Sequence, residues 1–209
     1  MPLTMGILTG AGSKIATINY ETVVGVNSGT TTFNSVDFGT PDPSRHIIAV
    51  PQNRAAAARS LTGVTLGGVT ATVVGRDNSG LNSSGLVFAK VPDGATGTVV
   101  VSWSGGVNRT TVGIWSVTGI DDLVSYGFRN SGGTLLVPVG GAVVLGSMNV
   151  YSGASTFTGA PRDYNIATGT NGWAGGHDNV PLGDAARNVD VSWASSSSKT
   201  IVAASFGAA

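Results

Sequence analysis

Cysteine is absent from the 209 residues of this chain. This excludes disulfide bonds and thiolate metal sites, so stability must come from a packed core or from neighbouring chains in an assembly. Charge is scarce as well, because charged residues make up only 11% and the formal net charge is zero. Binding to nucleic acid calls for a basic face, so we expect no nucleic-acid partner.

Long apolar runs are also missing. No stretch reaches the roughly 18 consecutive apolar residues of a membrane span, so we expect no membrane insertion. The N-terminal sequence MPLTMGILTGAG lacks a basic segment, and glycines interrupt its apolar part. It does not match a signal peptide, and we therefore expect a protein made in a cytoplasm.

Few residues suit catalysis or metal binding. The chain has one glutamate, Glu21, and two histidines, His46 and His177. Neither a GxSxG elbow nor a recognisable carboxylate pair is present. Asp163 and Asp184 lie near His177 in the sequence, but loop aspartates more often form turn hydrogen bonds than metal sites. We predict a non-enzymatic protein with no cofactor or metal, in which His46 is structural.

What the chain does have is a β-strand pattern, most clearly in residues 83–120. Val99, Val101 and Trp103 alternate there with Val100, Ser102 and Ser104. Such alternation between turn-forming residues is typical of strands and hairpins. We expect the face that carries Val99, Val101 and Trp103 to point into the core.

Strand-like segments recur along the chain, about eleven or twelve in all, as expected for an all-β protein. The pattern predicts a two-sheet antiparallel β-sandwich, of jelly-roll type. We expect one sandwich domain over residues 15–209, preceded by an arm over residues 1–14. Residues 53–60, NRAAAARS, fit either a short helix or a strand. The stretches VVVSWSGG and VDVSWASS are similar, and we interpret them as two half-buried strands rather than as a repeat.

One region stands out as a candidate for binding. Residues 160–187 are polar and rich in glycine, which predicts a long loop. Tyr164, Trp173 and His177 lie in it, and aromatic side chains in such a loop could stack on a sugar or contact another protein. The alternative is that the two aromatic residues fold back over the end of the sandwich.

The order of several motifs carries a resemblance. LTGVTLGGVTATVV, then FAKVPDGATGTVVVSWSGGVNRTTVGIWSVTGI, LLVPVGGAVVLGS, STFTGAPRDY and a closing AASFG extend over most of residues 61–207. Together they resemble small β-sandwich structural proteins of tailed bacteriophages and prophages.

The resemblance implies a virion component made in the bacterial cytoplasm. It would be a capsid decoration (cement) protein bound to the major capsid protein or to other virion subunits, as a homo-oligomer such as a trimer. The alternative is a tail or head-fibre component whose loop binds a host surface glycan. The resemblance implies no catalytic residues.

Overall fold

The computed structural model describes residues 15–25, 29–128, 135–150, 155–168, 171–180, 187–193 and 198–209. Every regular element in these ranges is a β-strand, seventeen in all, and neighbouring strands pair antiparallel. The predicted all-β antiparallel class is therefore confirmed. The predicted arm, residues 1–14, lies outside the described residues.

The strands form four sheets. The first inner sheet has the order β1 (Thr17–Gly25), β9 (Arg109–Thr118), β3 (His46–Arg54), β7 (Asn82–Lys90), β6 (Thr72–Ser79). The first outer sheet has the order β2 (Thr32–Asp37), β8 (Thr96–Trp103), β4 (Leu61–Leu66), β5 (Val69–Thr70). The second inner sheet has the order β10 (Ile120–Phe128), β17 (Lys199–Ala208), β12 (Ala142–Asn149), β15 (Asn171–Asn179), β14 (Arg162–Thr168). The second outer sheet has the order β11 (Leu135–Val137), β16 (Arg187–Trp193), β13 (Ser155–Thr158).

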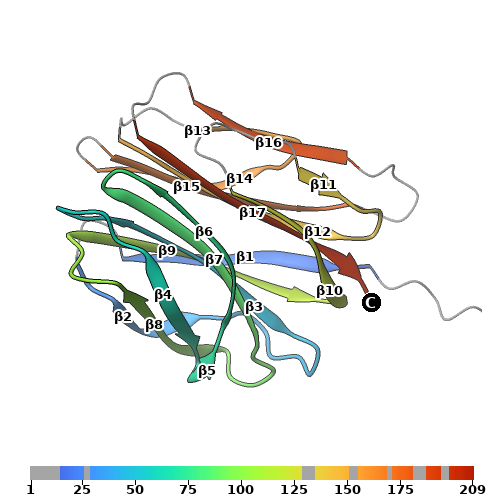
Figure 1. Cartoon of the computed structure of the whole chain (residues 1–209). Coiled ribbons are helices and arrows are strands. Elements are labelled where there is room, and N and C mark those ends of the chain that lie inside the picture. The colour runs from blue at the N-terminus through green and yellow to red at the C-terminus, as the bar shows by residue number, and fades with distance from the viewer. Residues whose placement is uncertain are drawn as a thin grey trace, which may run out of the picture.

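These sheets are stacked in four layers, with the two inner sheets face to face (Figure 1). Three apolar cores fill the spaces between successive layers. Two sheets were expected and four are present. The physical reason is that the inner strands are buried on both faces, so each inner sheet borders two cores.

Strand β3 illustrates this double burial. Ile48 and Val50 belong to the central core between the inner sheets, whereas Ile47 and Ala49 belong to the core under the first outer sheet. Each side chain of the strand therefore packs, and the sequence reads as a continuous apolar run instead of an alternating one.

The core face predicted on residues 99–103 is present. Val99 and Val101 are buried in the core under the first outer sheet, and Trp103 packs against that core while remaining partly exposed. Residues 53–60 are not helical: Asn53 and Arg54 end β3, and residues 55–60 form an irregular connection. Too few residues are available there to compensate for the cost of helix nucleation.

The second half of the chain repeats the strand order of the first. In residues 17–118 the first strand pairs with the last (β1 with β9), the next with β8, and β3 with β7. In residues 120–208 the same pairs are β10 with β17, β11 with β16, and β12 with β15. Strand β6 precedes β7, and strand β14 precedes β15. Strands β6 and β14 lie at equivalent edges of the two inner sheets.

Details of register repeat as well. A bulge interrupts the pairing of β6 with β7 at Val74, and another interrupts the pairing of β14 with β15 at Asp163. The similar stretches VVVSW and VDVSW end β8 and β16, the corresponding strands of the two outer sheets. Both stretches are half-buried strands, as expected, but they also occupy equivalent places in a repeated topology, so the expectation that they do not mark a repeat is wrong.

Candidate functional site

The region predicted to be a long loop is largely strand. Residues 162–168 and 171–179 form β14 and β15, which pair with each other in the second inner sheet. Trp173 is completely buried and Tyr164 is 7% exposed, both in the central core. The prediction of a loop is therefore wrong for these residues, and neither ring is available to stack on a sugar. Residues 169–170 and 181–186 of the predicted loop lie outside the described part.

The third predicted residue, His177, belongs to a polar cluster where the two inner sheets meet. Its Nδ1 lies 2.7 Å from Oδ2 of Asp163, and Nε1 of Trp115 donates to the same oxygen at 2.7 Å. Asp163 and Trp115 come from different halves of the chain, so this carboxylate links the two inner sheets. Asp163 can reach across because it is the bulged residue of β14, and bulges redirect side chains.

This cluster fixes the tautomer of His177. A carboxylate can only accept, so the Nδ1 of His177 carries the proton and donates it to Asp163. The Nε2 of a neutral ring is then an acceptor, and the side chain is 19% exposed. Within the described residues no further hydrogen-bond partner is recorded for the ring.

Three aromatic rings surround this carboxylate. Tyr20 of β1 lies 5.9 Å from Trp115 and 6.0 Å from Tyr164, measured between ring centroids. Tyr164 also donates from its hydroxyl to Oε1 of Gln52 at 3.3 Å. Burial raises the pKa of Tyr20, and the charge of Asp163 raises it further. Burial is also the main reason for the raised pKa of Tyr164, followed by Tyr20 and Asp163.

The buried phenol predicts a loss of stability at alkaline pH. Because the pKa of Tyr164 is higher in the folded protein, stability is unaffected below the ordinary tyrosine pKa of about 10 and falls as pH rises above it. Tyr164 alone should contribute about 1.4 kcal/mol per pH unit to the fall. Denaturant unfolding between pH 9 and pH 12 measures it, and Tyr164→Phe should give a shallower decline. An equally steep decline in that variant would contradict the assignment.

Replacing Asp163 by valine, the residue at the equivalent bulge of the first half, tests the link between the sheets. The buried indole N–H of Trp115 would lose its acceptor, which should lower the free energy of unfolding by about 1–3 kcal/mol. His177→Phe, which introduces the residue found at the matching position in β7, removes one of the two contacts and should cost less. The double variant should resemble Asp163→Val alone, and fully additive losses would show that His177 does not act through Asp163.

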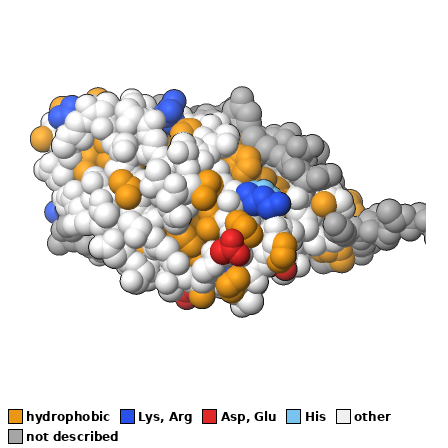
Figure 2. Space-filling view, turned by 90° about the horizontal axis from the view of Figure 1, so that it is seen from below, with side chains coloured by type: hydrophobic (Ala, Val, Ile, Leu, Met, Phe, Trp, Pro, Cys, Tyr) orange, Lys and Arg blue, Asp and Glu red, His pale blue; other side chains and the backbone are white. Residues whose placement is uncertain are grey.

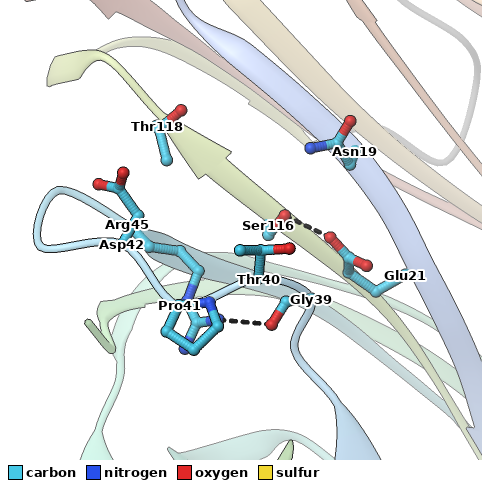
Figure 3. Close-up of a pocket in the computed structure, with 9 residues that line it drawn as sticks. All are labelled: Asn19, Glu21, Gly39, Thr40, Pro41, Asp42, Arg45, Ser116 and Thr118. Carbon is cyan, nitrogen blue, oxygen red and sulfur yellow. Dashed lines mark hydrogen bonds between the residues drawn. The ribbon is translucent and has the colours of Figure 1, made fainter. Parts of the chain in front are cut away.

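A second polar site lies on the other face of the first inner sheet (Figure 3). Its lining residues come from β1, β9 and the connection before β3: Asn19, Glu21, Gly39, Thr40, Pro41, Asp42, Arg45, Ser116 and Thr118. The hydroxyl of Ser116 donates to the carboxylate of Glu21. A Cβ on Gly39 would lie 2.3 Å from Oε1 of Glu21, and Gly39 also has a φ of +70°. Glycine is therefore required where the connection passes over Glu21.

Below this hollow lies Arg45, which sequence reasoning missed. It is completely buried, and its guanidinium donates only to backbone carbonyls. The five bonds reach Val91 (2.8 Å), Phe38 (3.0 Å), Gly39 (2.8 Å), Asp93 (2.9 Å) and Gly94 (2.7 Å). Through these hydrogen bonds, Arg45 links the connection before β3 to the turn after β7. This is a structural role.

The neighbouring His46 is half-buried, with Nδ1 3.1 Å from the carbonyl oxygen of Ser44 and its ring tilted against Phe88. Burial is the main cause of its lowered pKa. These contacts agree with the structural role expected for His46. Among the described residues there is no group of three His, Asp or Glu side chains placed to hold a metal ion, and no helix long and apolar enough to cross a membrane.

No protein-family model matches the chain, and no significant match was found among curated proteins or solved structures.

Proposed function

We propose that this chain is a non-enzymatic structural protein of a bacteriophage particle, a capsid decoration protein that binds the major capsid protein and stabilises the head lattice. The proposal continues the sequence resemblance. The structural observation that supports it best is the outward face of the first outer sheet.

That face is almost free of charge. Asp37, at the end of β2, is the single charged residue in the four strands of the first outer sheet. The outward positions carry small polar and aliphatic residues, all at least partly exposed: Thr32, Asn34, Thr65, Thr98, Val100 and Ser102. In the view of this side, charged side chains are few, and most of the surface is uncharged (Figure 2). Depletion of charge is what distinguishes the cores of protein interfaces from other surfaces.

The strand order adds support through architecture. In each half the chain alternates between an inner and an outer sheet, and strands from the beginning of the half pair with strands from its end. This arrangement favours the jelly-roll subtype, which viral capsid and lectin domains use. Fold alone does not establish function, so this point is an analogy. The jelly-roll arrangement agrees with a role in particle assembly.

The glycan-binding alternative is less well supported. It depended on exposed rings at Tyr164 and Trp173, and both are buried. The polar hollow beside Glu21 offers hydroxyls and carboxylates, but no aromatic residue lines it. A lattice partner therefore suits the described surface better than a sugar.

Localisation in particles tests the proposal. The expected result is that the chain co-sediments with intact particles from the bacterium that encodes it, and that immunogold label decorates the heads at regular positions. Particles from a strain with the gene deleted are the control for antibody specificity. Label on tails or fibres would favour the attachment role, and a chain left entirely in the soluble fraction would refute a virion role. Native mass spectrometry of the purified protein tests the expected trimer.

A further inference from the structure

One end of the stacked sheets is formed by strand ends from both halves of the chain. Strand β3 ends there at Arg54, which lies opposite Arg109, the first residue of β9, and opposite Asn82, the first residue of β7. The side-chain amide of Asn82 donates to the carbonyl oxygen of Ser198 at 3.2 Å, one residue before β17 begins. The C-terminus follows the other end of β17, so it lies at the opposite end of the molecule (Figure 1).

This end carries basic residues and no acidic ones, and we call it the basic end. Four Lys and Arg residues of the described part lie here: Arg54, Arg59, Arg109 and Lys199. The segments that connect strands at this end contain no Asp or Glu: 25–32, 54–61, 79–82, 103–109, 128–135, 149–155, 168–171 and 193–199. The chain as a whole has 11 basic and 11 acidic residues, so the excess is local. Figure 2 shows blue side chains and no red ones at its left-hand end.

Arg54 and Arg59 keep most of their hydrogen-bond donors for other groups. Nη1 of Arg54 donates to Oδ1 of Asn82 at 3.1 Å. Nε of Arg59 donates to the carbonyl oxygen of Gly106 at 3.1 Å, and its Nη1 lies 3.4 Å from a neighbouring carbonyl oxygen. Within the described residues these two guanidinium groups, both partly exposed, have no other hydrogen bond or ion pair. The buried Arg45 instead uses all five donors on carbonyls, so it is structural whereas Arg54 and Arg59 can bind an anion.

The pairing of Arg54 with Arg109 gives a second reason to expect an anion here. Residues directly opposite each other in an antiparallel pair project from the same face, and like charges placed in this way are destabilising. An anion bound at both side chains offsets this repulsion. A guanidinium group suits a carboxylate well, because its planar fork can donate two parallel hydrogen bonds to the two oxygens.

We propose that the basic end is a docking site for an acidic segment of another protein, whose Asp and Glu carboxylates pair with Arg54, Arg109 and Arg59. The inference does not rest on the proposed decoration function, because it concerns the charge of the partner and not its place in a particle. Complementary charges of this kind accelerate association and select which surfaces meet.

The arrangement of the arginines favours several linked carboxylates over a single small anion. Asn82 accepts from Arg54, and the hydroxyl of its neighbour Ser83 donates to the carbonyl oxygen of Arg59. Successive residues of a strand point to opposite faces of the sheet, so Arg54 and Arg59 reach the basic end from opposite faces of the first inner sheet. An acidic segment with separated charges suits such a pair better than one phosphate ion.

The overall charge favours a protein partner over nucleic acid. Domains that bind nucleic acid typically have a pI above about 9, whereas this chain has a pI of about 6.7 and a formal net charge of zero. Asp37, Asp42 and Asp93 lie toward the opposite end, at the end of β2, before β3 and after β7. A long nucleic acid that extended beyond the basic end would be repelled there, whereas an acidic protein segment contacts the basic end alone.

A fluorescent oligoglutamate peptide provides the test, by anisotropy with the purified full chain. We expect saturable binding that weakens as salt is added, and no binding of oligoglutamine of the same length. The double variant Arg54→Gln/Arg59→Gln, checked for an unchanged melting temperature, should bind about tenfold more weakly, because two ion pairs are lost. Arg76→Gln, at an exposed arginine of β6, is the matched control and should bind as the parent chain does.

Two results would overturn the assignment to the basic end: no binding of oligoglutamate at low salt, or an equal loss in Arg76→Gln. Competition separates the other occupants. Displacement of the peptide by inorganic phosphate at a comparable concentration would indicate a site for one small anion, and tighter binding of a single-stranded DNA oligonucleotide at the same salt concentration would indicate nucleic acid. Either result would also overturn the proposal. Because no particles are used, failure here leaves the decoration function to its own test.

Discussion

Replacing Arg45 by methionine should lower the free energy of unfolding by about 3–5 kcal/mol, because buried backbone carbonyls lose their hydrogen-bond donors. All five N–H donors of the guanidinium are used by carbonyl oxygens. Methionine fills much of the same volume but donates nothing. The carbonyls of Val91 and Phe38 are reached at buried sites, and each would lose its partner at a cost of about 1–3 kcal/mol.

Thermal and urea unfolding of the purified protein measure this loss. At roughly 2–4 °C per kcal/mol for a chain of this size, the melting temperature should fall by about 10 °C. Arg45→Lys should be intermediate, because an ammonium has three donors in place of five. Arg76→Met, at an exposed arginine of β6, is the matched control and should change stability by less than about 0.5 kcal/mol. Equal effects at Arg45 and Arg76 would show that the carbonyl contacts do not stabilise the fold.

Arg45 carries no signal that sequence reasoning could have used. It follows the turn residues Pro43 and Ser44 and precedes an apolar strand, a position in which an arginine is ordinarily exposed. Its burial depends on the turn after β7, which is more than forty residues away. The carbonyls that surround it converge only once the first inner sheet has formed.

The antiparallel β-sheet class was predictable from the sequence, but the number of stacked sheets was not. Period-two patterns identified strands such as residues 96–103 correctly, because one face of β8 is buried and the other is open. Strands β3, β9 and β12 are buried along nearly their whole length, so their residues show no alternation that would indicate which core each one joins. A continuous apolar run implies two covered faces, but it does not say what covers them.

The glycines of β15 explain why a strand was mistaken for a loop. A Cβ at Gly175 would lie 2.3 Å from Cε1 of Tyr164 and 2.8 Å from Cη2 of Trp115. On strand β9 of the first inner sheet, a Cβ at Gly113 would lie 2.6 Å from Cη2 of Trp115 and 2.7 Å from Cε1 of Tyr164. The glycines therefore make room for aromatic side chains between the inner sheets, a role of glycine in strands that composition does not distinguish from turn formation.

The repeated topology was hidden for a related reason. The inner sheets of the two halves contact each other, so their side chains became complementary instead of identical, as at Ser84, whose hydroxyl lies 2.6 Å from that of Thr200. Similarity survives in the middle strands of the outer sheets, where VVVSW and VDVSW occupy matching places. A single short match could not be separated from coincidence without the strand order.

Replacing Trp173 by alanine should lower the free energy of unfolding, because this side chain belongs to the core and not to an exposed binding site. The side chain is completely buried in the central core, and truncation of a buried tryptophan costs about 3–5 kcal/mol through lost burial and the cavity left behind. Trp103→Ala should cost less, about 1–2 kcal/mol, because Trp103 is partly exposed at the end of β8.

Trp173→Phe distinguishes loss of packing from loss of a polar contact. Within the described part of the chain the indole Nε1 of Trp173 has no hydrogen-bond partner, so phenylalanine gives up ring volume but no bond. Its cost should be smaller than that of Trp173→Ala, because phenylalanine keeps a six-membered ring in the core and leaves a smaller cavity. Urea unfolding of the three variants against the parent chain should show the largest loss for Trp173→Ala and smaller losses for Trp103→Ala and Trp173→Phe. A Trp173→Ala protein as stable as the parent would place this ring outside the central core and return it to the surface as a binding residue.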